Sequence, residues 1–101
     1  MEIKEIISVL KEIEGLFPSI TAWQLTFTSD GQIIVVIGLT TNTKTEEFKR
    51  KSSKLLKIFN CAGSLADVAD NAISIYLPRN ITITKLIALI ASLAALAIPV
   101  S

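Results

Sequence analysis

The chain has 101 residues, of which half are hydrophobic and 19% are charged, and its formal net charge is +1. This length predicts one globular core, and the near-neutral charge excludes a general attraction to nucleic acid or anionic surfaces, so any such binding must be local. Cys61 is the single cysteine and histidine is absent, which excludes an internal disulfide and removes the commonest zinc ligand and general base. We therefore expect a protein that is not an enzyme and that holds no cofactor or metal.

Residues 1–17 carry a helical pattern. Their apolar positions recur at steps of three and four, which predicts an amphipathic helix with one buried face; these positions are Ile3, Ile6, Ile7, Leu10, Ile13 and Phe17. Gly15 and Pro18 end this helix. The charged start differs from a signal peptide, so we expect the N-terminal part to be made and kept in the cytoplasm.

Residues 21–40 change to the period of a β-strand. Trp23, Leu25 and Phe27 alternate with polar residues, which predicts a strand with one covered face and places Trp23 in the core. The Asp30-Gly31 pair is a strong hairpin signal. It leads into residues 33–39, a nearly continuous apolar run that predicts a central strand covered on both faces.

A second helix is predicted from Thr43 or Lys44, because Thr43 and Glu46 have the spacing of a capping box. Its expected apolar stripe contains Phe48, Leu55, Ile58 and Phe59, with Ser52 filling the gap between turns. The stretch CAGSLADVADN that follows is predicted as a connection. Its Asp67 and Asp70 suit a turn cap better than a cation site, since two carboxylates are too few ligands.

The stretch AISIYLP is predicted as a third strand, and a final apolar helix is expected to begin between Ile81 and Thr84. The predicted fold class is therefore α+β, in the order α-β-β-α-β followed by a hydrophobic C-terminal helix. Two helices are expected to pack on one face of a three-stranded antiparallel sheet. Residues 1–80 form the predicted α+β domain, and residues 81–101 form the C-terminal helix.

About half of the chain resembles a known domain. The matching features are a helix ending in Leu-x-Pro, a hairpin whose second strand ends in glycine, and a second helix; they are carried by Leu16, Pro18, Leu25, Gly31, Ile37, Gly38, Phe48 and Leu55. Over roughly residues 10–60 the chain resembles the small ferredoxin-like domain of the fimbrial-assembly proteins in the inner-membrane platform of type IV pili and type II secretion. The resemblance implies a ferredoxin-like fold and a membrane-associated scaffold. That family places its membrane helix before this domain, whereas here the apolar segment follows it.

The C-terminal segment has three possible surroundings. Residues 86–101 are uncharged and span about 24 Å as a helix, against about 30 Å of bilayer hydrocarbon. Small residues at three- and four-residue spacing permit close helix approach in a membrane or an oligomer core; the predicted membrane or oligomer face contains Leu86, Ile87, Ala88, Ala91, Ser92 and Ala95. The third alternative is packing on the open face of the chain's own sheet.

A basic cluster lies on the second predicted helix. Lys49, Arg50, Lys54 and Lys57 form a candidate patch for an anionic partner, and the last three share one helical face. The alternative interpretation is an ordinary solvated face. Nucleic acid is disfavoured as the partner because exposed aromatic residues do not accompany the charges.

From these patterns we predict a non-enzymatic, membrane-associated structural protein that is tail-anchored by its C-terminal helix. It would scaffold a pilus or secretion platform or a membrane-containing virion, with its N-terminal domain in the cytoplasm if the tail spans the bilayer, and otherwise in the cytoplasm or virion. Its predicted partners are lipid or copies of itself, through the C-terminal helix, and other assembly proteins. The alternatives are a soluble self-assembling subunit whose C-terminal helices form an oligomer core, and a basic-helix module that binds nucleic acid or anionic lipid.

Overall fold

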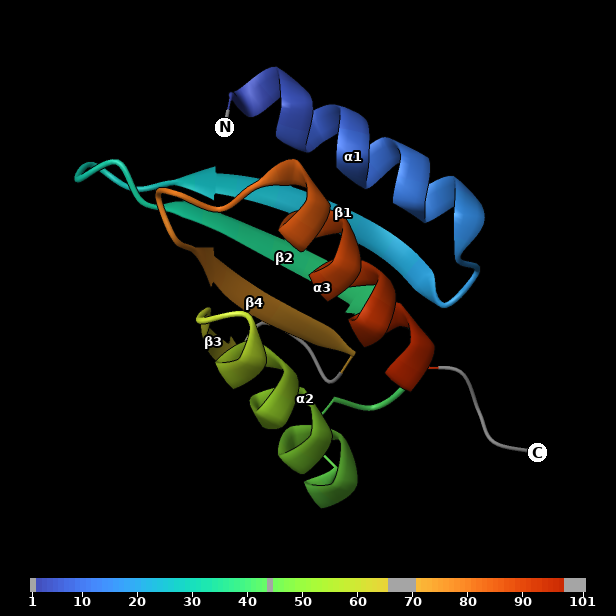
Figure 1. Ribbon diagram of the computed structural model, residues 1–101. Helices are drawn as coiled ribbons and strands as arrows, with labels where there is room; N and C mark the ends of the chain where they lie inside the picture. The colour runs from blue at the N-terminus through green and yellow to red at the C-terminus, as the bar shows by residue number, and fades with distance from the viewer. Residues whose placement is uncertain (1, 44, 66–70, 98–101) are drawn as a thin grey trace.

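Three helices and four strands alternate along the described chain, which in this computed structural model comprises residues 2–43, 45–65 and 71–97 (Figure 1). In chain order they are α1 (Ile3–Leu16), β1 (Ile20–Phe27), β2 (Ile33–Leu39), α2 (Glu46–Ile58), β3 (Ala62–Leu65), β4 (Ala72–Leu77) and α3 (Ile83–Leu96). The predicted α+β class is confirmed. Asp67 and Asp70, considered above as turn caps or cation ligands, lie outside the described residues.

The strands form one antiparallel sheet in the order β1-β2-β4-β3. The prediction of three strands was therefore wrong, because part of the expected connection forms β3 against β4. Its sequence, AGSL, is short and rich in residues of low strand propensity, so no alternating pattern marked it. β2 and β3 both run antiparallel to β4 and so are parallel to each other. With α2 between them in sequence and β4 between them in the sheet, they form a split β-α-β unit.

All three helices lie on one face of the sheet, with α3 between α1 and α2 (Figure 1). Val35, Ile37 and Ile75 point to this side and are completely buried. On the other face, none of the described helices covers the sheet, and Gln24 and Thr26 of β1 are exposed there. β2 is central, as predicted, but its residues Ile34 and Val36 are only half-buried on the open face. The expectation that both faces of β2 are covered was wrong, because α3 packs on the same face of the sheet as α1 and α2.

The α1 helix and the β1–β2 hairpin follow the sequence pattern closely. Ile6, Val9, Leu10 and Ile13 form the buried stripe of α1, which ends at Leu16 just before Pro18. Trp23 is half-buried and packs against the core, as the alternation predicted. Gly31 has φ of 86°, a left-handed conformation that glycine adopts without strain, and it completes the predicted turn after Asp30.

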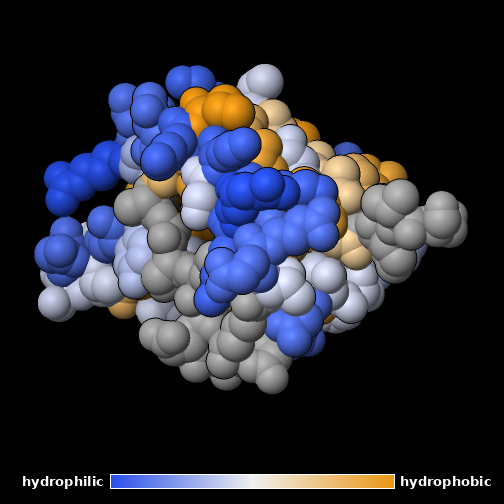
Figure 2. Space-filling view, turned by 90° about the horizontal axis from the view of Figure 1, so that it is seen from below, coloured by the Kyte–Doolittle hydropathy of each residue, from blue (hydrophilic) through white to orange (hydrophobic). Residues whose placement is uncertain are grey.

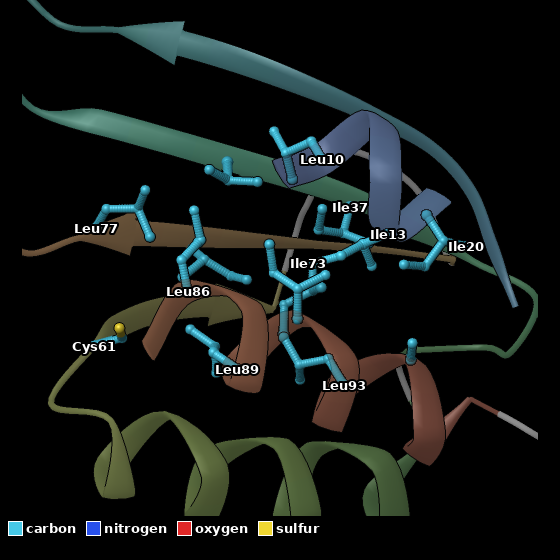
Figure 3. Packing of buried hydrophobic residues seen from close by; sticks show 14 of the residues in the cluster. Leu10, Ile13, Ile20, Ile37, Cys61, Ile73, Leu77, Leu86, Leu89 and Leu93 are labelled. Carbon is cyan, nitrogen blue, oxygen red and sulfur yellow. The ribbon is translucent and has the colours of Figure 1, made fainter. Parts of the chain in front are cut away.

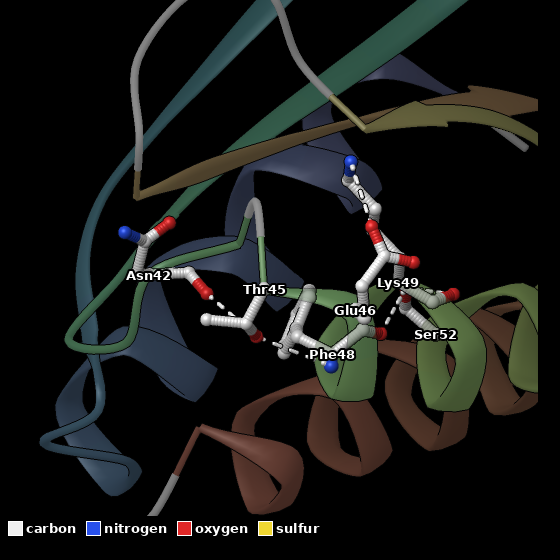
Figure 4. A network of polar contacts seen from close by, with 6 residues as sticks. All are labelled: Asn42, Thr45, Glu46, Phe48, Lys49 and Ser52. Atoms are coloured by element: carbon white, nitrogen blue, oxygen red, sulfur yellow. Dashed lines mark hydrogen bonds and ion pairs between the residues drawn. The ribbon is translucent and has the colours of Figure 1, made fainter.

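The start of α2 differs from the prediction by two residues (Figure 4). Thr45 is the N-cap, and its hydroxyl oxygen accepts the Phe48 N–H at 3.3 Å. Thr43, the predicted cap, is instead buried and donates its hydroxyl to the carbonyl oxygen of Ala72 at 2.9 Å. A threonine two residues on therefore caps the helix, while Thr43 ties the β2–α2 connection to β4.

The buried stripe of α2 also differs from the prediction. It consists of Phe48, Ser52 and Leu56, with Leu55 and Phe59 half-buried. Ile58 was predicted in this stripe but is 72% exposed, because steps of four from Phe48 turn the core side of the helix away from position 58. Ser52 is tolerated in the core because its hydroxyl donates to the carbonyl oxygen of Phe48 at 2.7 Å.

The apolar C-terminal helix packs on the chain's own sheet (Figure 3). Thr82 caps α3 by accepting the Lys85 N–H at 3.2 Å, and the helix then buries Leu86, Leu89, Ile90 and Leu93 completely. Three surroundings were considered for this segment: a bilayer, an oligomer core and the chain's own sheet. In the structure α3 packs on the chain's own sheet, but on the face that also carries α1 and α2 and not on the open face. Across residues 2–43, 45–65 and 71–97, the structure contains no helix with the length and apolar character needed to cross a membrane.

Two hydrogen bonds fix the C-terminal end of α3 to the start and end of the hairpin. The buried hydroxyl of Ser19 donates to the carbonyl oxygen of Ala94 at 2.8 Å, and the hydroxyl of Thr40 donates to that of Ala97 at 3.3 Å. Both carbonyls belong to the last turn and cap of α3, where helical hydrogen bonding is incomplete, and the carbonyl oxygen of Ala94 also accepts the Ala97 N–H at 3.2 Å. The segments predicted as a domain of residues 1–80 and a helix of residues 81–101 thus contribute to one core.

Candidate functional site: the exposed face of α2

The residues predicted for a membrane or oligomer face do not form one surface. Leu86 is completely buried in the core, whereas Ile87, Ala88 and Ala95 are exposed. Ala91 and Ser92 are half-buried on the flanks of α3. The outer side of α3 is therefore a largely uncharged strip between α1 and α2, and of the two large predicted contact residues only Ile87 belongs to it.

Most of the basic cluster of α2, in contrast, lies on one exposed surface. Arg50, Lys54 and Lys57 are exposed, and their spacing of four and three residues puts them on the side of α2 that faces away from the core. They form no ion pair within the described part of the chain. Lys49 was predicted in the same patch but is half-buried on the flank of the helix.

The first turn of α2 neutralises two of its five basic residues. Lys49 Nζ lies 3.8 Å from Glu46 Oε1 (Figure 4), and Lys51 Nζ lies 2.8 Å from Glu47 Oε1. The hydrogen bond from Lys51, its positive charge and that of Arg50 hold the pKa of the Glu47 carboxyl below its usual value. The acidic residues also suit the positive end of the helix dipole. The unpaired positive charge is therefore concentrated toward the C-terminal half of α2.

Ile58 lies within this positive charge. It follows Lys57 and stands one helical turn after Lys54, and it is the most exposed large hydrophobic residue in the described chain. We call Arg50, Lys54, Lys57 and Ile58 the α2 face. Figure 2 views the molecule from the side of α2 and shows hydrophilic side chains gathered over the middle of this surface. An apolar side chain beside cations offers both a contact that excludes water and long-range attraction.

Charge is distributed unevenly between the two outer helices. α2 carries five basic and two acidic residues, whereas α1 with its N-cap Glu2 carries two basic and four acidic residues. The two helices are separated by α3 (Figure 1) and thus do not neutralise each other. The nearly neutral chain consequently has one positive side and one negative side.

The cavities of the described chain are small or shallow. An enclosed space of about 40 Å³ lies between Ile6, Ile33, Ile81 and Arg79, which is room for water but not for a substrate. A shallow depression of about 240 Å³ lies on the open sheet face beside Gln24 and Val36. The described residues contain no group of three metal-ligating side chains.

Among the described residues, the single thiol has no polar partner that would activate it. Cys61 is 8% exposed, and its Sγ is 3.6 Å from the carbonyl oxygen of Phe59. Burial raises the pKa of this thiol above its usual value. A thiol that resists ionisation is a poor nucleophile and metal ligand, so Cys61 behaves as a small core residue.

Comparison with known proteins finds no match: no family model, no curated protein and no solved structure matches this chain.

Proposed function

We propose that this protein is a non-enzymatic assembly subunit that binds an acidic segment of a partner protein on the α2 face. The observation that carries the proposal is the combination, on one exposed helical face, of Ile58 at 72% exposure with three cations, Arg50, Lys54 and Lys57, that form no ion pair among the described residues. Attraction between opposite charges brings the partner to the correct side of the molecule, and burial of Ile58 then contributes apolar contact.

The same observation favours a protein partner over nucleic acid or lipid. Binding of single-stranded nucleic acid relies on exposed aromatic rings for stacking, and the α2 face has none. A helix that lies in a bilayer surface needs a broad apolar side, whereas the apolar stripe of α2 is already packed on the core. A single exposed isoleucine among cations instead suits an acidic helix or strand that carries an apolar anchor of its own.

This proposal keeps the assembly role that the resemblance to pilus-platform domains implies, but it moves the contact surface from the C-terminal segment to α2. The burial of Leu86, Leu89 and Leu93 in the core supports the move. We further propose that the sheet is a rearranged ferredoxin-like sheet, and the split unit β2-α2-β3 around β4 supports that relationship.

The test measures binding of four probes to the intact chain. These are a 20-residue peptide of repeating Glu-Glu-Leu-Leu, a poly-glutamate peptide of equal length, a 20-nucleotide single strand, and phosphatidylserine vesicles. We expect the first peptide to bind most tightly. The double variant K54E/K57E should weaken its binding about tenfold or more, since two favourable charge contacts become repulsive.

Two variants separate the α2 face from nonspecific attraction. K4E/K11E makes the same change in net charge on α1, where both lysines are exposed, and it should alter binding by about twofold or less at moderate salt. Ile58→Ala should weaken binding of the Glu-Glu-Leu-Leu peptide but not of poly-glutamate, because only the former can cover the isoleucine. Equal losses in the two charge-reversal variants, or tighter binding of the oligonucleotide or the vesicles, would refute the proposal.

A further inference from the structure

The β1 edge of the sheet is long and lightly protected. β1 has eight residues, ITAWQLTF, and occupies the end of the sheet order, so alternate backbone N–H and C=O groups along its outer side have no strand to pair with among the described residues. Natural edge strands are normally blunted by charged residues, proline or β-bulges. Between Ile20 and Phe27 there is no charged residue and no proline, and the one register shift, between Ile20 and Ala22, leaves residues 22–27 regular.

Apolar side chains accompany this edge on the helix side of the sheet. Phe27 is 49% exposed, and Trp23 and Leu25 are only half-buried although α1 lies over their side of the sheet. Ile3, in the first turn of α1, is 48% exposed. An additional strand beside β1 would extend the surface on which these side chains pack.

We propose that β1 pairs antiparallel with β1 of a second copy of this chain, which joins two four-stranded sheets into one sheet of eight strands. A two-fold axis perpendicular to the sheet keeps all six helices on the same side and puts Trp23 and Leu25 beside the equivalent residues of the second copy. With the axis at Gln24, residues 21–27 of each strand are paired, which is about 24 Å of strand. Both copies contribute the same strand to this interface, so no β1 edge is left free and the assembly closes as a dimer.

The opposite edge of the sheet makes a poorer partner for β1. β3 has only four residues, and α2 lies against it. Contact between β1 of one copy and β3 of the next would therefore pair at most four residues, and it would continue as an open chain of subunits. The longer and self-matching surface favours the β1–β1 dimer, and this inference does not depend on the function proposed for α2.

The experiment compares the mass of the intact chain and two variants in detergent-free solution by light scattering during size-exclusion chromatography. Gln24 and Thr26 are exposed on the open sheet face, so Q24K/T26K should leave the monomer folded. If the two-fold axis passes Gln24, the two lysines at position 24 oppose each other; if it passes Leu25, the lysine at position 24 of each copy opposes the one at position 26 of the other. We expect the intact chain at twice its 10.9 kDa mass and a dimer dissociation constant raised about tenfold or more by the variant.

The matched control T84K/A88K adds the same charge at two exposed positions of α3. T84K/A88K should remain dimeric. If instead T84K/A88K were monomeric and Q24K/T26K dimeric, the contact between copies would lie on α3 and the proposal would be wrong. Hydrogen exchange gives a second readout: alternate amides between Ala22 and Phe27 should exchange more slowly as chain concentration rises. Exchange at β1 that does not depend on concentration, or a monomeric intact chain at 100 µM, would likewise overturn it.

Discussion

Replacement of Leu93 by alanine tests whether α3 is part of the core. The Leu93 side chain is completely buried between the sheet and the other helices (Figure 3). Truncation of a buried leucine to alanine removes apolar contact and leaves a cavity, at a cost of about 2–5 kcal/mol. A value near 3 kcal/mol is a large part of the stability of a domain of this size and corresponds to a fall in Tm of more than about 10 °C.

Ile87→Ala on the same helix is the matched control. Ile87 is 41% exposed, so the same kind of truncation should cost about 1 kcal/mol or less. Urea unfolding followed by circular dichroism without detergent measures both, and Leu93→Ala should lower the midpoint by about 1–3 M. Similar small effects of the two substitutions would refute the packing of α3 on the sheet.

Three further predictions concern polar groups. Thr43→Val leaves the carbonyl oxygen of Ala72 without its buried donor and should cost about 1–3 kcal/mol in urea unfolding; no loss would mean that the bond is dispensable. The Cys61 thiol should react with Ellman's reagent at pH 8 at least about tenfold more slowly in the native chain than in urea, because burial raises its pKa. The pKa of Asp30 is lowered mainly by the hydroxyl of Thr28, with a smaller contribution from Arg79. Wild-type chain should therefore have a higher Tm than Asp30→Asn above the unfolded-state pKa, and this difference should vanish as pH falls through the lowered pKa of the native state.

Local patterns predicted most of the elements because each is encoded over neighbouring residues. The stripe Ile6, Leu10 and Ile13, the Asp30-Gly31 turn and the apolar run of β2 each specify an element without distant contacts. β3 was missed since AGSL has no alternation, and pairing with β4 supplies the order that its own residues lack.

The surroundings of α3 were not decided by its sequence. A helix that is apolar on every side can pack equally well against lipid, a second subunit or a sheet. Only tertiary packing determines that Leu86 is buried and Ile87 exposed. The positions of Arg50, Lys54 and Lys57 were predictable from helical spacing alone. Ile58 was misplaced because Leu55, Ile58 and Phe59 have the i, i+3, i+4 spacing of a helical stripe, whereas the buried stripe runs through Leu56.

The two proposed surfaces lie on opposite sides of the molecule, since β1 is one end of the sheet and α2 packs beside β3 at the other (Figure 1). A dimer joined through β1 would therefore present two separate α2 faces. Such a subunit can bind two acidic segments at once, which raises its effective affinity for a multivalent partner.

Native mass spectrometry of the intact chain mixed with the Glu-Glu-Leu-Leu peptide tests this two-sided account most directly. The account predicts a complex of two chains and two peptides, which becomes one chain with one peptide in Q24K/T26K and two chains without peptide in K54E/K57E. A single chain that binds no peptide, or a dimer that loses its peptide in K4E/K11E as readily as in K54E/K57E, would contradict it.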